Sequence, residues 1–277
     1  MRIAVTGGKG GTGKSAIATA ITAYLAEKNK VMLIDLDADC PNDHLILDIE
    51  RRKEKDVESM IPDIDFSKCI KCGKCSEVCQ FKAIVHVKGK KPILIPEQCS
   101  GCGACKIACP VKCIGETKKK IGTIYSGKKG NITFISSDLK PGEPVSEFVV
   151  DAAKDFAKTK EKEQDIIIID TAAGTHCDVI SACTGCDLAL AVTEPTPLGA
   201  HDLKLILDLL KILKVPAKIV LNKSTVGDKR LIQDIAKEYD VEITAEVPYE
   251  KSIVEAYSKG EPIKHKSIEK IAGELEK

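Results

Sequence analysis

Eight of the thirteen cysteines form two copies of one run, and this repeat is the strongest constraint on the fold. Each copy reads C-x2-C-x2-C-x3-C: the first contains Cys69, Cys72, Cys75 and Cys79, and the second contains Cys99, Cys102, Cys105 and Cys109. Three thiolates spaced by two residues can wrap one [4Fe–4S] cube within a short loop, whereas the fourth comes one helical turn later and points away. The spacing therefore predicts two clusters with crossed ligation, in which Cys109 completes the first site and Cys79 completes the second.

Zinc sites and disulfides are the alternatives to this interpretation. Structural zinc sites usually present two C-x2-C pairs separated by a longer spacer, which three evenly spaced cysteines plus one do not match. Met1 is followed at once by the apolar segment Ile3–Thr6, so we expect no signal peptide, and no apolar run reaches the length of a membrane span. We therefore expect a cytoplasmic protein without membrane contact, whose cysteines bind metal in a reducing compartment.

Residues 62–116 resemble the bacterial two-cluster ferredoxins through both cysteine runs and through a hairpin predicted between them, over residues 83–95. The resemblance implies a small α+β domain that binds two [4Fe–4S] clusters. The chain departs from that family at Gln80, where proline is usual, and at Cys113, where a small apolar residue is usual. We interpret Cys113 as a small buried side chain in preference to a ninth ligand.

A glycine-rich loop lies upstream of the cysteine runs, between the apolar strand Ile3–Thr6 and a segment of helical periodicity over residues 15–29. The order strand, loop, helix is the context that identifies a P-loop. Backbone amides and the helix N-terminus would bind phosphates, Lys14 would reach the β- and γ-phosphates, and the Ser15 hydroxyl would bind Mg²⁺. The predicted ATP-binding loop consists of Gly8, Lys9, Gly10, Gly11, Thr12, Gly13, Lys14 and Ser15.

The loop reads Lys-Gly-Gly-Thr-Gly-Lys-Ser, which resembles the deviant Walker A motif of the Min, Mrp, Par and nitrogenase iron proteins. This resemblance spans most of the chain and implies a P-loop ATPase that forms an ATP-sandwich homodimer. In such a dimer Lys9 reaches across the interface to the partner's nucleotide.

The same resemblance assigns roles to four residues beyond the loop. Asp37 matches the switch I carboxylate that orients the attacking water. Asp170 follows a buried apolar strand, as in a Walker B motif, and would hold Mg²⁺ through water. Gly174 matches the switch II glycine whose N–H lies near the γ-phosphate, and Asn222 matches a residue that binds the edge of the adenine base.

Strands and helices alternate on both sides of the cysteine runs, which predicts an α/β fold with a doubly wound, mostly parallel sheet. We expect the ATPase domain to occupy residues 1–60 and 118–277, interrupted by the ferredoxin-like insert at 61–117. The charged stretch 50–58 and the lysine-rich stretch 117–130 are interpreted as surface connections, with their lysines on a solvated face. Further helices are expected near 146–159, 198–214, 228–239 and 264–276, and further strands near 132–136, 187–193, 217–221 and 241–247.

Three other cysteines invite a metal-binding hypothesis. Cys177 lies seven residues after Asp170, at the offset where the nitrogenase iron protein has a ligand to a cluster shared between subunits. That protein takes its second ligand from the segment before Walker B, and the matching residues 131–164 contain no cysteine, so we do not expect a shared cluster. Cys183 and Cys186 form a C-x2-C pair, for which a redox or metal role and a buried structural role both remain open.

Nearly equal numbers of basic and acidic residues, 42 against 41, argue against broad nucleic-acid binding. The first functional hypothesis is an ATPase whose nucleotide state repositions two clusters against a redox partner. The alternative is an Mrp-type carrier that delivers iron–sulfur clusters to an acceptor protein. Positioning of the Min and Par type ranks third, because the tail offers only Ile268, Ile271 and Leu275 as an amphipathic face. Hydrolysis that is intrinsic and hydrolysis that needs a partner both remain open.

Overall fold

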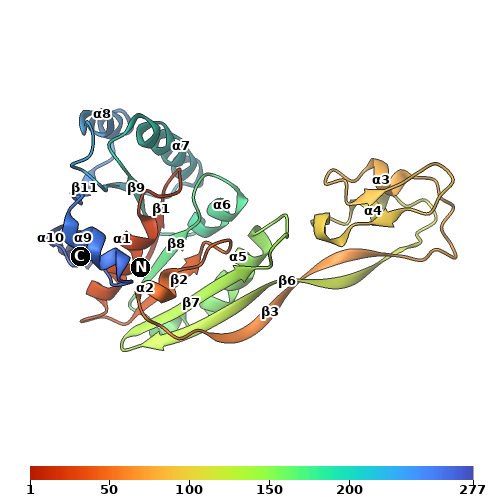
Figure 1. Ribbon diagram of the computed structural model, residues 1–277, viewed down its shortest axis with the longest axis horizontal. Coiled ribbons are helices and arrows are strands. Elements are labelled where there is room, and N and C mark those ends of the chain that lie inside the picture. Colours follow the sequence, from red (N-terminus) through yellow and green to blue (C-terminus); the bar gives the residue numbers. More distant parts are fainter. Residues whose placement is uncertain (277) are drawn as a thin grey trace.

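The computed structural model describes residues 1–276 and contains a nine-stranded sheet from which a two-stranded ribbon projects (Figure 1). The strand order is β11-β10-β9-β1-β8-β2-β7-β6-β3. Neighbours from β11 to β7 are parallel, whereas β6 is antiparallel to β7 and β3 is antiparallel to β6. The strands are β1 (Arg2–Thr6), β2 (Val31–Leu36), β3 (Arg52–Ile64), β6 (Ile114–Lys129), β7 (Ile132–Leu139), β8 (Ile166–Thr171), β9 (Leu188–Thr193), β10 (Ala217–Leu221) and β11 (Ile243–Glu246).

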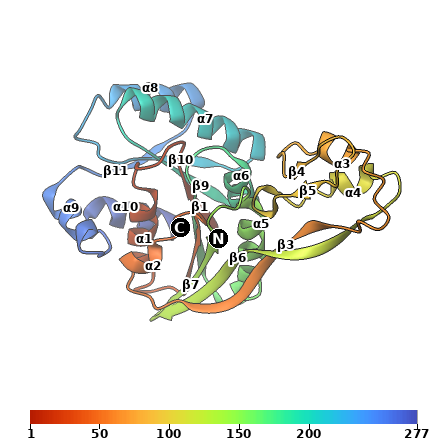
Figure 2. The ribbon, with the colours of Figure 1, turned by 45° about the vertical axis from the view of Figure 1, so that its right-hand side comes forward.

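Helices cover both faces of the parallel part of the sheet. Figure 2 shows α1 and α10 on one side of the strands and α5 and α6 on the other, where α7 and α8 also pack. Strands buried on both faces read as continuous apolar runs, which is why the sequence predicted them. The helices are α1 (Lys14–Leu25), α2 (Asp43–Ile46), α3 (Lys74–Glu77), α4 (Ala104–Ala108), α5 (Glu147–Lys158), α6 (Cys177–Cys183), α7 (Pro197–Leu213), α8 (Arg230–Tyr239), α9 (Lys251–Ser258) and α10 (Lys266–Leu275).

The expectation that residues 50–58 and 117–130 are surface connections is wrong. They belong to β3 and β6, which pair in antiparallel register from Arg52↔Ser126 to Ile64↔Ile114. The base of β6 also pairs with β7, so the ribbon continues the edge of the sheet. With 13 residues, β3 spans roughly 40 Å at about 3.4 Å per residue. Most side chains of β3 and of the outer half of β6 are exposed, so these segments lack the apolar alternation that identifies a half-buried strand.

Opposite charges face each other across this ribbon. The Nζ of Lys118 lies 3.1 Å from Glu58 Oε2, and the Nζ of Lys120 lies 2.6 Å from Asp56 Oδ1. Cross-strand ion pairs of this kind favour the antiparallel pairing, although their exposure to solvent keeps the effect small. The charges that suggested a loop are thus part of the strand pairing.

The two cysteine runs lie at the far end of the ribbon, between β3 and β6 (Figure 1). The predicted hairpin is present as β4 (Ile84–Val85) and β5 (Ile93–Leu94), paired antiparallel. The short helices α3 and α4 begin after Gly73 and Gly103, whose φ values of 79° and 73° favour glycine. No helix within residues 1–276 combines the length and apolar character needed to cross a membrane.

Candidate nucleotide site and cysteine cavities

The glycine-rich loop joins β1 to α1 and has the backbone conformation that its glycines permit. Gly11 and Gly13 have φ values of 78° and 92°, in the left-handed region. A Cβ on Gly13 would collide with the Nδ2 of Asn222, so this position has neither the conformation nor the space for a side chain. Lys14 is buried and donates from its Nζ to the carbonyl of Lys9 at 3.3 Å, across the loop.

Carboxylates from two neighbouring strand ends lie beside the start of α1. Asp170 ends β8 and accepts a hydrogen bond from the Ser15 hydroxyl at 2.6 Å. Burial raises the pKa of Asp170 to about 7, although the Ser15 hydrogen bond and Lys14 both favour its charged form. Burial also raises the pKa of Asp37, which follows β2, and lowers the pKa of Lys14. The site brings together Lys14, Ser15, Asp37 and Asp170 as the sequence predicted, and a cation would stabilise its crowded carboxylates.

Lys9 is bound within its own chain in this structure. Its Nζ lies 2.6 Å from Glu194 Oε1, and the Nζ of Lys223 lies 3.1 Å from the other oxygen of the same carboxylate. Lys223 also donates to the carbonyl of Gly11 at 2.8 Å. Reaching a partner's nucleotide would require Lys9 to leave Glu194. Sequence reasoning missed Glu194, although it follows the buried strand β9 as Asp170 ends β8.

Two further predicted residues make contacts that bear on their expected roles. The N–H of Gly174 donates to the carbonyl of Gly7 at 3.1 Å, so this bond must break before the N–H can bind a phosphate. Asn222 donates from Nδ2 to the carbonyl of Thr12 at 2.7 Å and is buried behind the loop. Asn222 also lines the cleft above the loop, together with the exposed aromatic side chains of Tyr249 and Tyr257, which sequence reasoning missed.

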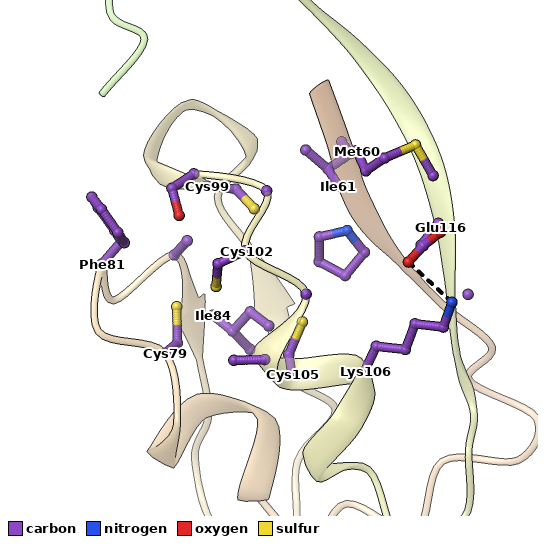
Figure 3. Close-up of a pocket in the computed structure, with 17 residues that line it drawn as sticks. Met60, Ile61, Cys79, Phe81, Ile84, Cys99, Cys102, Cys105, Lys106 and Glu116 are labelled. Atoms are coloured by element: carbon purple, nitrogen blue, oxygen red, sulfur yellow. Dashed lines mark hydrogen bonds and ion pairs between the residues drawn. The ribbon is translucent and has the colours of Figure 1, made fainter. Parts of the chain in front are cut away.

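Two cavities in the insert are lined by the cysteine runs. All thirteen cysteines are free thiols, which removes the disulfide alternative. Each cavity combines three cysteines of one run with the fourth cysteine of the other, as crossed ligation requires. Figure 3 shows the cavity next to Lys106 and Glu116, where Cys79 and Cys102 turn their sulfurs toward each other. The first cavity is lined by Cys79, Cys99, Cys102 and Cys105, and the second by Cys69, Cys72, Cys75 and Cys109.

The spacing of these sulfurs does not suit a single metal ion. Thiolates that share one zinc lie roughly 4 Å apart, because each Zn–S bond is about 2.3 Å. Within residues 1–276, no three cysteine sulfurs lie within 4.8 Å of one another. The thiol donors and their wider spacing fit an iron–sulfur cluster better than zinc.

The cysteines outside the two quartets differ in their surroundings. Cys183 and Cys186 are buried, and burial raises their pKa values to about 12 and about 11, which favours the structural role over a redox or metal role. Cys177 is exposed at the start of α6. Cys113 is buried as expected, but its sulfur lies 3.5 Å from that of Cys109, a contact that the sequence did not reveal.

Lys119 links the insert to the body of the sheet through a buried ion pair and two hydrogen bonds. The Nζ of Lys119, on β6, lies 2.6 Å from Glu143 Oε2, and the two side chains are only 10% and 3% exposed. The same Nζ donates to the carbonyls of Pro96 at 2.6 Å and Cys99 at 3.4 Å. We call these four residues the Lys119 junction. Glu143 belongs to the loop between β7 and α5, which both views place beside the insert (Figures 1 and 2).

This junction is connected to the segment that follows β8 and contains Gly174. Ser146, at the end of the same loop, donates from its hydroxyl to Asp178 Oδ2 at 2.9 Å. Asp178 lies in the first turn of α6, which follows Gly174 closely along the chain. Lys154 and Ser181 further join α5 to α6 by a hydrogen bond. Hydrogen bonds, one ion pair and short segments of the chain therefore link Gly174 to the backbone of Cys99.

Comparison with known proteins identifies relatives of the whole chain. A model of the family described as the CobQ/CobB/MinD/ParA nucleotide binding domain matches residues 3–263. The uncharacterized protein MJ0579 of Methanocaldococcus jannaschii is 37% identical over 264 residues, which are 94% of this chain and 90% of that protein.

Solved structures of similar fold include two archaeal proteins. The septum site-determining protein MinD of Pyrococcus horikoshii, complexed with Mg-ADP, has a TM-score of 0.63 at 18% identity, covering 100% of this chain and 96% of its own. The cell division ATPase MinD of Pyrococcus furiosus has a TM-score of 0.62 at 19% identity, covering 100% of this chain and 98% of its own. At these identities the likeness concerns the fold alone.

Proposed function

The chain belongs to the CobQ/CobB/MinD/ParA nucleotide-binding family, and we propose that it is an ATPase whose nucleotide state governs electron transfer through two [4Fe–4S] clusters. Family membership supports the ATPase part. The cluster part rests on one observation: each of two cavities combines three cysteines of one run with the fourth of the other. Insert residues 61–117 would then be a ferredoxin-like domain within an ATPase domain made of residues 1–60 and 118–277.

The chemistry proposed for the nucleotide site follows from the side chains around the loop. Lys14 would bind the β- and γ-phosphate oxygens, and Asp37 would orient the attacking water. Ser15 and Asp170 would hold Mg²⁺, which neutralises phosphate charge when bound. Most of the catalysis would therefore be electrostatic and positional, as is usual for phosphoryl transfer.

The proposed coupling follows the contacts of the Lys119 junction. A route along the chain from Asp37 to Cys69 would be long, because α2 and the full length of β3 lie between them. Movement of Gly174 away from Gly7 would displace α6 and the loop that contains Glu143. Through Lys119 this displacement would reach the carbonyl of Cys99, one of the proposed ligands.

ATP should change the rate at which an iron chelator removes iron from the anaerobic protein, and ADP should change it less. A nucleotide shifts a conformational equilibrium only if it binds the two states with different affinity. Asp37→Asn should slow hydrolysis and keep the ATP-induced change. Lys119→Met should lose the change while still hydrolysing ATP, and Lys118→Met, an exposed neighbour on the same strand, is the matched control. Identical chelation rates in the nucleotide-free, ADP and ATP states would contradict the proposal.

Lys9→Ala should weaken ATP-dependent dimerisation more than it weakens nucleotide binding by the monomer. The proposed dimer needs Lys9 at the partner's nucleotide, whereas Lys14 and Ser15 bind the nucleotide of their own chain. Light scattering with ATP measures the dimer. Lys223→Ala removes the other lysine on Glu194 and should leave the dimer largely intact. A Lys9→Ala variant that dimerises normally would make Lys9 an ordinary loop residue.

Positioning of the Min and Par type is the second candidate. The comparisons support it more directly than its third rank in the sequence analysis suggested, because the family name and both solved relatives include MinD. One feature speaks against a Min-type membrane helix at α10: Ile268, Ile271 and Leu275 are buried against the sheet and α1. A variant lacking both cysteine quartets would separate the candidates, since a positioning ATPase should keep its ATP-dependent localisation.

Cluster delivery of the Mrp type remains the alternative within iron–sulfur chemistry. It requires a labile cluster that an apo-acceptor protein can remove. Incubation of the anaerobic protein with such an acceptor, with and without ATP, would distinguish it. Iron gained by the acceptor favours delivery, and electron transfer with retained iron favours the redox function.

A further inference from the structure

The two cysteine runs share a backbone conformation at one matching position but differ in the side chain there. Lys71 in the first run matches Gly101 in the second, and their φ values of 57° and 78° are both in the left-handed region. A Cβ on Gly101 would collide with the hydroxyl of Ser59 and the carbonyl of Met60, so β3 leaves no room for a side chain. Lys71 is exposed. The ribbon therefore covers the second run at a point where the first run is open to solvent.

The two cysteine cavities also differ in the charge of their lining. Among the described residues, the cavity of the first run is lined by Lys71 and Lys74 and by no acidic residue. Both lysines are exposed, and within residues 1–276 neither takes part in an ion pair. The cavity of the second run is lined by Lys106, whose Nζ lies 3.0 Å from Glu116 Oε1 in the same lining (Figure 3). Of the two cavities, the first thus has the uncompensated positive charge.

Apolar side chains lie among the lysines of the first cavity. Ile70 is 59% exposed and Val111 is 36% exposed, and both line this cavity. Aliphatic side chains exposed to this degree favour association with a partner that removes them from water. We call Ile70, Lys71, Lys74 and Val111 the first-run face. It combines apolar contact area with unpaired positive charge.

We propose that the first-run face is the docking surface for the acidic face of an electron-transfer protein. This inference rests on the proposed function, because docking here would bring the partner's one-electron carrier next to the cluster held by Cys69, Cys72, Cys75 and Cys109. One electron would pass between the two centres, so that the donor is oxidised by one electron and the acceptor is reduced by one, and no bond forms or breaks. The lysines would attract and orient the acidic partner, and Ile70 would strengthen the contact.

The contacts of the insert with the rest of the chain agree with this assignment. Lys119, whose Nζ is paired with Glu143, donates to the carbonyl of Cys99, a proposed ligand at the second cavity. The side of the insert that contacts the ATPase body therefore belongs to the second run. The first cavity is left for an external partner.

The test is electron transfer from the dithionite-reduced, nucleotide-free protein to two haem proteins of opposite charge, followed by absorbance. Oxidised cytochrome b5 is the acidic probe and oxidised cytochrome c is the basic one, and each accepts one electron at its haem iron. The variant combines Lys71→Gly, which copies Gly101, with Lys74→Gln. Its rate constant with cytochrome b5 should fall roughly tenfold at about 0.1 M salt and depend less steeply on salt, whereas its rate constant with cytochrome c should rise.

The matched control, Lys120→Gln with Lys128→Gln, removes the same charge from exposed positions on β6. At about 3.4 Å per residue, Lys120 lies roughly 20 Å along the strand from Ile114, which lines the first cavity, and Lys128 lies farther away. This separation exceeds the Debye length of about 10 Å at 0.1 M salt. Both rate constants of the control should therefore match those of the wild type.

Iron content, sulfide content and the EPR spectrum are measured on the same samples. A wild type without clusters would overturn the proposed electron transfer together with the docking. Intact clusters with an unchanged rate to cytochrome b5 would overturn docking at this face and leave the proposed function standing. Rates that move in the same direction with both probes would show that the lysines act only on the cluster potential, and this too would overturn the docking.

Discussion

Lys14→Ala should abolish nucleotide binding, or reduce ATP hydrolysis by roughly 100- to 1,000-fold, while the iron content stays unchanged. Lys14 is the buried cation of the loop, already desolvated and held by the carbonyl of Lys9, so it meets the phosphates with little reorganisation. The cysteine cavities lie at the other end of the ribbon, in a separate part of the fold.

Binding of a fluorescent ATP analogue, phosphate release and total iron are the measurements for this variant. Lys28→Ala, an exposed lysine just beyond the same helix, is the matched control and should behave as the wild type does. Iron lost together with nucleotide binding would show that the insert does not fold independently of the loop, contrary to the proposed domain organisation.

Cys109→Ala should remove the cluster built on Cys69, Cys72 and Cys75, although its own run is the other one. Two complete quartets predict about eight iron and eight sulfide per chain in the anaerobic wild type, and the variant should retain about half. The reason is that Cys109 lines the cavity of the first run. Iron and sulfide analysis and the EPR spectrum of the reduced protein measure the loss.

Cys113→Ala is the matched control for this prediction, because the sulfur of Cys113 lies 3.5 Å from that of Cys109 in the same cavity. It should keep both clusters. Loss of the cluster at Cys99, Cys102 and Cys105 in the Cys109→Ala variant would contradict crossed ligation. Half the iron lost in Cys113→Ala would make that cysteine a ligand.

The parts of the fold that the sequence predicted are those determined locally. The strand, glycine loop and helix of the nucleotide site are contiguous, and parallel strands buried on both faces have a continuous apolar pattern. The ribbon escaped prediction because each of its strands is stabilised by the other, across the whole insert. Most side chains of β3 and of the outer half of β6 are exposed, so this part of the ribbon lacks the alternation that a core imposes.

Among the residues of the candidate sites, too, those with a local sequence signal were predicted and those placed only by the fold were not. Asp37 and Asp170 were predicted because each lies at the end of an apolar strand. Tyr249 and Tyr257 were not, because only the fold brings them to the cleft above the loop. Lys119 was interpreted as one of several solvated lysines, and nothing in the sequence distinguishes it from Lys118 or Lys120. Its burial depends on Glu143, from a loop that packs against β6 only in the folded chain.

The pairing of β3 with β6 also limits the ways in which the length of the ribbon can change. β3 and β6 pair over most of their length, with register shifts between Lys53 and Lys55 and between Val57 and Glu58, so a longer or shorter ribbon requires both strands to gain or lose residues. One residue from each would shorten it by about 3.4 Å and turn every outer side chain to the opposite face, whereas two from each would retract it by roughly 7 Å and keep the faces. The distance between the nucleotide site and the cysteine cavities can therefore change during evolution when both strands gain or lose residues, two at a time if the side chains are to keep their faces. The ion pair between Lys119 and Glu143 would fix the point from which this distance is counted.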